Sequence, residues 1–276
     1  MQAVVFDEPG NEDVLRVAEV PPPTLRNGEV RISVTGAGIN RADLLQRRGL
    51  YPPPPGASEI IGLECAGTLT EIGAGIDDLA VGDRVMALLA GGGYATETVV
   101  PSVCVMRTPE NLTDLQAAAI PEVFITAFLN LFWIGDLEAK STVLVHGGSG
   151  GVGTAAIQLA KCAGARVFVT AGSAERCRAC LELGADAAFD YRENDFLSAS
   201  LDATGGHGVD VVLDCIGGKY LDRHLDVLAL YGRLVVIGLQ GGARAEIDLR
   251  RLMRKRLTIS GSTLRARPPE EKGQII

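Results

Sequence analysis

The chain has little of what several classes of function require. Cationic charge is in the minority, because 26 Lys and Arg face 34 Asp and Glu and give a formal net charge of −8. An acidic chain is a poor counterion for a phosphate backbone, so we do not expect nucleic acid as a partner. One basic run at residues 250–256 stands out. We interpret it as solvated surface, with phosphate recognition as the alternative.

Signals for secretion and for membrane insertion are also missing. The first nine residues contain no basic segment and reach acidic residues at once. The most apolar stretch, residues 117–134, contains Pro121, Glu122 and Asn130, which favours a buried helix over a membrane span. We therefore expect a soluble, cytoplasmic protein without a membrane partner.

Cysteine and histidine are few and scattered. A chain of 276 residues needs no disulfide staples, so we interpret its six cysteines as free thiols. Cys177 and Cys180 form a C-x-x-C pair without a second ligand pair, and we assign them to ordinary helix positions. The three histidines, His146, His207 and His224, are isolated in the sequence, and we interpret each as structural or surface.

Two textures divide the remaining sequence. Residues 1–118 contain short β-type runs broken by Gly and Pro, such as residues 29–34, 67–73 and 83–88, which predict a partly antiparallel β domain. Pro52–Pro55 follow Tyr51 and predict a rigid loop.

From residue 119 to residue 262 strands and helices alternate. Continuous apolar runs at 143–146, 166–170, 209–214, 233–237 and 257–262 are typical of strands buried on both faces. Helical stretches are expected at 152–162, 174–183 and 219–230. This alternation predicts a doubly wound parallel sheet, which makes the chain an α/β protein with two domains.

A glycine-rich loop carries the strongest functional signal. Gly148, Gly150 and Gly153 form a G-x-G-x-x-G pattern between a predicted buried strand and a predicted helix. Glycine allows the backbone to approach a pyrophosphate, and the helix N-terminus offers free N–H groups and the positive end of its dipole. The loop therefore predicts a dinucleotide site in a Rossmann domain.

The end of the next strand distinguishes the two nicotinamide cofactors. A site for NAD usually has an acidic residue there, which accepts a hydrogen bond from the ribose 2′-hydroxyl. The segment after Thr170 contains Ser173 and Arg176 instead, although Glu175 is close by. A hydroxyl and a cation suit a 2′-phosphate, so we predict NADPH as the cofactor.

Several segments together resemble the medium-chain dehydrogenase/reductases. They are Asn40–Asp43, Gly62–Gly67, Val81–Val85 and the glycine loop. Within that superfamily the chain is similar to zinc-free quinone oxidoreductases, most of all the p53-inducible subgroup, which has a similar Tyr-proline run and a similar segment to 214–218. The resemblance covers nearly the whole chain and implies a GroES-like first domain before the Rossmann domain.

The resemblance also implies which groups are missing. Zinc-dependent relatives have Cys and His where this chain has Asn40 and Leu63, no Cys lies between Pro121 and Ala127, and no four-cysteine lobe exists. We therefore expect no metal. A hydride would pass directly to an electron-poor acceptor such as a quinone.

Roles for individual residues follow from the same resemblance. Asn40 and Tyr51 are expected to be catalytic and to line the nicotinamide and substrate site, where Tyr51 could donate a hydrogen bond to the quinone oxyanion. A helix-capping Asn40 and a packing Tyr51 are the alternatives. The other cofactor contacts that the resemblance implies are Thr126, Gly148, Gly150, Gly151, Val152, Gly153, Ser173, Arg176, Tyr191, Gly217 and Gly238.

The resemblance carries two expectations about assembly. Relatives continue for some fifty residues beyond the position of Ile276, so residues 263–276 are expected to start a truncated return to the first domain. Relatives also dimerise through the last strand of the cofactor domain, which predicts a homodimer through Leu257–Ser262.

Three functions are compatible with this sequence. The first is an NADPH:quinone reductase, which acts on a small-molecule quinone. The second is an NADPH-dependent enal or enone reductase, because both reactions place an electron-poor π-system over the nicotinamide. The third, from a different class, is a crystallin-like or RNA-binding protein that retains the NADPH fold with little catalysis.

Overall fold

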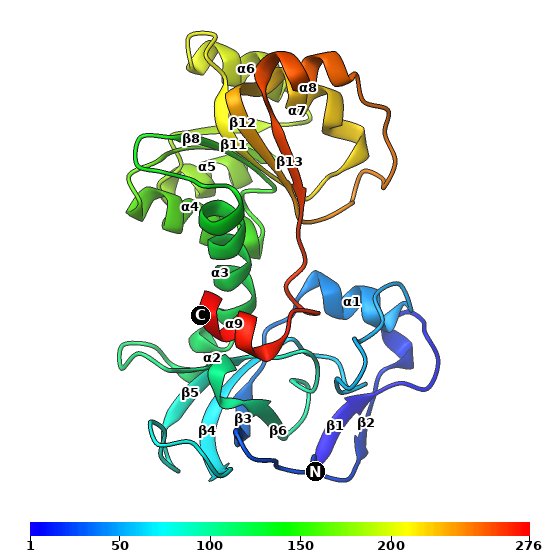
Figure 1. Cartoon of the computed structure of the whole chain (residues 1–276). Coiled ribbons are helices and arrows are strands. Elements are labelled where there is room, and N and C mark those ends of the chain that lie inside the picture. Colours follow the sequence, from blue (N-terminus) through cyan, green and yellow to red (C-terminus); the bar gives the residue numbers. More distant parts are fainter. The chain divides into compact units, whose positions relative to one another are not determined.

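The computed structural model describes all 276 residues, and the chain divides into two compact units. Unit 1 consists of Met1–Ile125 and Leu264–Ile276, and unit 2 consists of Thr126–Thr263. Figure 1 shows the two units and labels most of their helices and strands. No helix in the chain is both long and apolar enough to cross a membrane.

Unit 1 is built on an antiparallel sheet with the strand order β6-β3-β4-β5-β7 and on a separate β1-β2 hairpin. Buried apolar side chains from β3, β4 and β5 form its core. Its elements are β1 (Gln2–Val5), β2 (Arg16–Glu19), β3 (Glu29–Gly36), α1 (Arg41–Arg47), β4 (Glu64–Ile72), β5 (Arg84–Leu88), β6 (Glu97–Pro101), β7 (Val105–Arg107), α2 (Asp114–Ala117), α3 (Pro121–Phe128, which runs into unit 2) and α9 (Pro269–Ile275), with short 3-10 turns at Glu12–Val14 and Ser102–Cys104.

Unit 2 is a six-stranded parallel sheet in the order β10-β9-β8-β11-β12-β13. Its strands are β8 (Thr142–His146), β9 (Arg166–Ala171), β10 (Ala187–Asp190), β11 (Val209–Asp214), β12 (Leu228–Val236) and β13 (Thr258–Gly261). Its helices are α4 (Gly151–Cys162), α5 (Ala174–Glu182), α6 (Phe196–Ala203), α7 (Leu221–Val227) and α8 (Leu249–Lys255), with a π-helical stretch at Leu129–Ile134 and a 3-10 turn at Gly218–Tyr220.

The strand order of unit 2 reverses between β8 and β11. The chain first winds from β8 outward to β10 and then crosses to β11, so α4 and α5 cover one face and α6, α7 and α8 cover the other (Figure 1). Val143, Leu144 and Val145 of β8 are buried because both faces of this central strand are covered. In such a sheet, ligands bind at the carboxyl ends of the strands where the order reverses.

This architecture confirms the predicted fold class, with differences at the level of single elements. The predicted helix at 219–230 is shorter, because residues 228–230 already belong to β12. In the stretch 117–134, where a buried helix is predicted, the helix runs from Pro121 to Ile134, because α3 continues directly into the π-helical stretch, and Ala117 ends the separate helix α2. None of the six cysteines forms a disulfide, and Cys177 and Cys180 lie on α5.

Candidate cofactor and substrate site

The glycine loop leaves the carboxyl end of β8 and forms a cradle without side chains. A Cβ on Gly148 would lie 2.5 Å from Cβ of Val169, and a Cβ on Gly153 would lie 2.3 Å from the Gly147 carbonyl oxygen. Gly147 itself has a φ of 72°, in the left-handed region that favours glycine. Any other residue at these positions would displace the loop from the strand and from helix α4.

Helix α4 begins directly at this cradle. Its N-cap, Gly150, has no side chain with which to cap the helix, so the first backbone N–H groups of the helix are left without a side-chain acceptor. Ser149, Gly150 and Gly151 are exposed, so an anion can reach them. Free N–H groups and a helix dipole at an exposed glycine turn fit a pyrophosphate.

A second loop lies at the same edge of the sheet, after β11. Asp214 ends β11, and its carboxylate accepts hydrogen bonds from the backbone N–H groups of Ile216 (2.7 Å) and Gly217 (2.9 Å). Gly217 has a φ of 79°. Gly238 follows β12, and a Cβ there would lie 3.1 Å from the carbonyl oxygen of Cys215. Adjacent strands β8, β11 and β12 thus bring the glycine loop, Gly217 and Gly238 to one edge.

The residues predicted for the 2′-phosphate gather at the end of β9. The Ser173 hydroxyl caps α5 by accepting a hydrogen bond from the Arg176 backbone N–H at 3.3 Å. The Tyr191 hydroxyl lies close to Gly172, because a Cβ on that glycine would be 2.7 Å from it. The Arg176 and Glu175 side chains are both exposed, so the cation is available to a phosphate.

Thr126 is the remaining predicted cofactor residue in unit 2. It lies on α3, and its carbonyl oxygen accepts a hydrogen bond from Nδ2 of the buried Asn130 at 2.7 Å. The structure thus groups the predicted cofactor residues of unit 2 into the two glycine loops, the β9 end and Thr126.

In unit 1, Asn40 is fixed by two acidic residues. Its Nδ2 donates to Oε1 of Glu64 at 2.7 Å, and its backbone N–H donates to Oδ2 of Asp43 at 2.8 Å. The other Glu64 oxygen accepts from the Glu122 backbone N–H at 2.9 Å. Asn40 therefore precedes α1 as its N-cap and also connects through Glu64 to the start of α3.

The carboxyl groups around Asn40 are shielded from water. Burial raises the pKa of Asp43 and of Glu64, although backbone hydrogen bonds oppose the shift at both groups. Burial raises the pKa of Glu122 to about 8, helped by the negative charges of Glu64 and Asp43. Glu122 therefore carries a proton at neutral pH, and its Oε2 is buried without a hydrogen-bond partner.

Tyr51 lies against a cation from the C-terminal segment of unit 1. The Arg265 guanidinium lies 5.4 Å from the Tyr51 ring centre and donates to the Tyr51 carbonyl oxygen at 3.4 Å, to the Ala90 carbonyl oxygen at 2.8 Å and to Oε1 of Gln46 at 2.7 Å. Burial raises the pKa of the Tyr51 phenol, while Arg265 opposes the shift. The phenol is a hydrogen-bond donor at neutral pH.

Sequence reasoning missed the partners of these residues. Glu64 and Glu122 are distant from Asn40 in the sequence, and Arg265 is distant from Tyr51, so no local spacing connects them. The histidines are isolated in the sequence but two of them are not isolated in space, because Nε2 of His146 lies 2.9 Å from Nε2 of His224. The signal that could have found this pair is that His146 ends β8 and His224 lies on the helix that follows β11, the strand next to β8 in the sheet.

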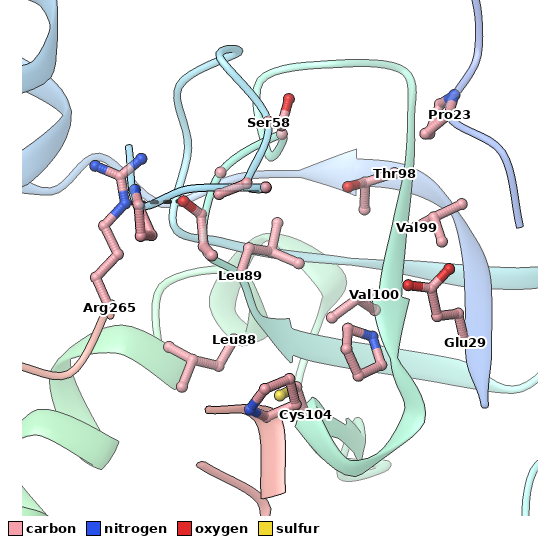
Figure 2. A pocket seen from close by; sticks show the side chains of 18 of the residues that line it. Pro23, Glu29, Ser58, Leu88, Leu89, Thr98, Val99, Val100, Cys104 and Arg265 are labelled. Carbon is pink, nitrogen blue, oxygen red and sulfur yellow. Dashed lines mark hydrogen bonds between the residues drawn. The ribbon is translucent and has the colours of Figure 1, made fainter. Parts of the chain in front are cut away.

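A cavity of about 500 Å³ lies in unit 1 beside the edge strand β6. Figure 2 shows Leu88, Leu89 and Cys104 on its walls and Arg265 at one side. Neither Asn40 nor Tyr51 lines it. The cavity is thus separate from the predicted site residues.

The basic run at 250–256 is largely used within the fold. Arg251 contacts Asp222 and Asp226, and Lys255 donates to the carbonyl oxygens at the end of α7. This arrangement favours the interpretation as structural surface over phosphate recognition.

Comparisons with known proteins agree with this geometry. The family model described as "Alcohol dehydrogenase GroES-like domain" matches residues 26–110, and the one described as "Zinc-binding dehydrogenase" matches residues 151–275. An Escherichia coli quinone oxidoreductase, solved in complex with NADPH, is 31% identical with a TM-score of 0.87, over 100% of this chain and 85% of that one. The chain belongs to the medium-chain dehydrogenase/reductase superfamily. This confirms the predicted superfamily.

Two further proteins resemble the chain to a similar degree. The CurK enoyl reductase is 30% identical with a TM-score of 0.87, over 99% of this chain and 85% of that one. A phenolphthiocerol/phthiocerol polyketide synthase of Mycobacterium tuberculosis is 38% identical over 233 residues, which are 84% of this chain. The chain spans only 11% of the length of that synthase.

The match to the "Zinc-binding dehydrogenase" family does not by itself show that this chain binds zinc. The amide nitrogen of Asn40 is committed to Glu64, and Leu63 is an apolar side chain that is 1% exposed. Neither residue supplies a ligand of the kind that zinc prefers, so no catalytic step is assigned to zinc.

Proposed function

We propose that the chain is an NADPH-dependent reductase that transfers hydride to a quinone without a metal. The observation that carries the proposal is the glycine cradle at the N-terminus of α4, with Ser173, Arg176 and Tyr191 grouped at the end of the next strand. The NADPH complex of the Escherichia coli quinone oxidoreductase supports both the cofactor and the acceptor.

NADPH supplies the hydride, and the protein supplies binding, orientation and hydrogen bonds. The α4 N-terminus binds the pyrophosphate, and Arg176 pairs with the 2′-phosphate. Tyr51 keeps its phenolic proton because burial raises its pKa, and it donates a hydrogen bond to the acceptor oxygen as negative charge develops there. Glu64 fixes the orientation of the Asn40 amide through a 2.7 Å hydrogen bond.

An enoyl reductase is the second candidate, and the 38% identity to a polyketide synthase and the likeness to CurK favour it. Quinone and enoyl thioester turnover by the same preparation discriminate between the two. A specificity constant at least tenfold higher for a quinone supports the first proposal. A reversed ratio supports the second.

The cofactor proposal is tested at Arg176. Replacement by Gln removes the cation that pairs with the 2′-phosphate. We therefore expect NADPH to bind about tenfold more weakly and the affinity for NADH to stay unchanged. Arg178→Gln is the matched control, because Arg178 is exposed on the same helix. Fluorescence titration gives both dissociation constants, and equal losses for both cofactors would contradict the assignment.

We also propose a homodimer through β13. This strand is the edge of the parallel sheet and carries the partly exposed Ile259, so its outer backbone groups are available to a second copy. Light scattering should give twice the mass of the chain, and Ile259→Lys should shift the protein to monomer. A monomer at micromolar concentration for the wild type contradicts this proposal. An RNA-binding role receives no support from the net charge of −8.

A further inference from the structure

Two imidazoles are buried beneath the loops of the nucleotide site. His146, at the end of β8, is 4% exposed, and His224, on α7, is 0% exposed. Phe196 and Tyr220 pack on the His146 ring at centroid distances of 4.8 and 5.2 Å. This aromatic wall separates the pair from water, so the hydrogen bonds of the imidazoles must be made inside the protein.

The contacts of the pair extend in both directions. Nδ1 of His146 lies 2.9 Å from Oγ1 of Thr170, and Thr170 Oγ1 lies 3.4 Å from the Gly147 N–H. At the other end, Nδ1 of His224 has no hydrogen-bond partner, and the nearest acceptor is Oδ2 of Asp214 at 3.8 Å, which is a charge contact rather than a hydrogen bond. Hydrogen-bond distances thus connect Gly147 through Thr170 and His146 to His224, and the charge contact leads on to Asp214 in the loop after β11.

The groups at the two ends determine the donor and acceptor direction of these hydrogen bonds. Asp214 already accepts two backbone N–H groups, so it is an acceptor, and its carboxylate favours the tautomer of His224 with a proton on Nδ1, the nitrogen that faces it across 3.8 Å. Nε2 of His224 is then bare and accepts from Nε2–H of His146. Nδ1 of His146 is bare in turn and accepts the Thr170 hydroxyl proton, which leaves Thr170 Oγ1 free to accept from the Gly147 N–H.

We propose that His146 and His224 are positioning residues that hold the glycine loop and the Ile216–Gly217 loop in register for the pyrophosphate and nicotinamide end of NADPH. The inference rests on the proposed cofactor. It follows from the two ends of this series of interacting groups, because Gly147 begins one loop and the backbone of Gly217 in the other loop donates to Asp214. Neither imidazole needs to touch the cofactor.

The arrangement of the nitrogens argues for hydrogen bonds rather than a metal ion. Ligands on a tetrahedral zinc with bonds of about 2.0–2.1 Å lie about 3.3 Å apart, whereas the two Nε2 atoms are 2.9 Å apart. That distance is usual for an N–H···N hydrogen bond. Atoms of His146, Asp214 and His224 do lie within 4.8 Å of one another, so metal content is measured as part of the test.

The first experiment needs no variant. Nitrogen-15 NMR of histidine-labelled wild-type protein should show two neutral imidazoles, one protonated at Nε2 (His146) and one at Nδ1 (His224). Single replacements assign the signals. The reverse pair of tautomers overturns the proposed direction, and stoichiometric zinc by elemental analysis overturns the hydrogen-bonded chain.

The second experiment measures cofactor binding. His224→Phe retains an aromatic ring but removes both nitrogens, and we expect NADPH to bind about tenfold more weakly. Adenosine 2′,5′-bisphosphate, which occupies only the adenosine end, should bind within about twofold of wild type. His224→Asn, which retains a donor toward Asp214, should recover part of the affinity. His207→Asn is the control, because His207 is an exposed histidine of the same unit.

The outcomes separate this inference from the proposed function. Equal weakening of NADPH and of the bisphosphate by His224→Phe means general loss of fold and overturns the positioning role, as does unchanged NADPH affinity. If wild-type protein binds no NADPH, the proposed function fails. The tautomers measured by NMR then still decide whether the buried chain of hydrogen bonds exists.

Discussion

The two units bury different sets of ionisable groups. Unit 1 buries carboxyl groups around Asn40, and burial raises their pKa values, to about 8 at Glu122. Unit 2 buries His146 and His224, and burial lowers their pKa values, to about 3 at His224. Both sets lie next to predicted site residues. In each unit burial favours the neutral form of these groups.

The difference means that the units lose stability at opposite ends of the pH scale. A buried acid stays protonated only if the pH is low enough, so unit 1 is expected to weaken as the pH rises. A buried imidazole stays neutral only if the pH is high enough, so unit 2 is expected to weaken as the pH falls.

Removal of Arg265 should cause the largest effect, and only in unit 1. Arg265→Met leaves three acceptors without their donor and removes a cation from the carboxyl cluster, which should lower the free energy of unfolding of unit 1 by about 3–5 kcal/mol. Hydrogen exchange of peptides from β3 and β4 measures it. Arg16→Met, at an exposed ion pair with Asp7, should change stability by less than about 0.5 kcal/mol. Similar losses in both variants would contradict the prediction.

Acid should unfold unit 2 first. The unfolded state binds more protons at the two histidines between pH 6.5 and their lowered pKa values, so stability falls through this window. Asp214 opposes the trend, because its pKa is raised to about 6 and its proton is favoured in the folded state. The net loss between pH 7 and pH 4 should be about 3 kcal/mol. Fluorescence of Trp133, the single tryptophan and a residue of unit 2, reports it.

Glu122→Gln should remove part of the alkaline sensitivity of unit 1. Because the pKa of Glu122 is raised, its carboxyl group contributes to the free energy of unfolding below pH 4.5, and this contribution is lost as the pH rises through 8. The variant should therefore match wild type at pH 4.5 and be more stable by about 2 kcal/mol at pH 9, a value reduced because the side chain is partly exposed. Denaturant titrations at both pH values decide it. If the free energies of unfolding of the variant and the wild type differ by the same amount at both pH values, the carboxyl group does not titrate as proposed.

Neutral helix caps should give the smallest effects, without dependence on pH. Thr113→Ala in unit 1 and Ser173→Ala in unit 2 each remove a side-chain acceptor from a helix N-terminus. Each should cost about 1 kcal/mol at pH 5 and at pH 8 alike. A pH-dependent cost at either cap would mean that the buried ionisable groups are not the source of the contrast.

The sequence sufficed for features in which neighbours along the chain are neighbours in space. The strand before Gly147, the glycine turn and helix α4 are one continuous segment, and their pattern predicted the fold and the candidate cofactor site. The roles of individual residues there stay predictions. The carboxyl cluster and the histidine pair could not be predicted, since 24 positions separate Asn40 from Glu64 and 78 separate His146 from His224. The early start of β12 was missed because Leu228–Leu230 continue the apolar period of α7.

Arg265 gives the order of synthesis a physical meaning. Unit 2 is one uninterrupted segment, whereas unit 1 is completed by residues that are translated after all of unit 2. On the ribosome, unit 2 can fold before Arg265 is synthesised, when the acceptors at Tyr51, Ala90 and Gln46 still lack their hydrogen-bond donor. The first half of the chain to be made is therefore the last to reach its final stability.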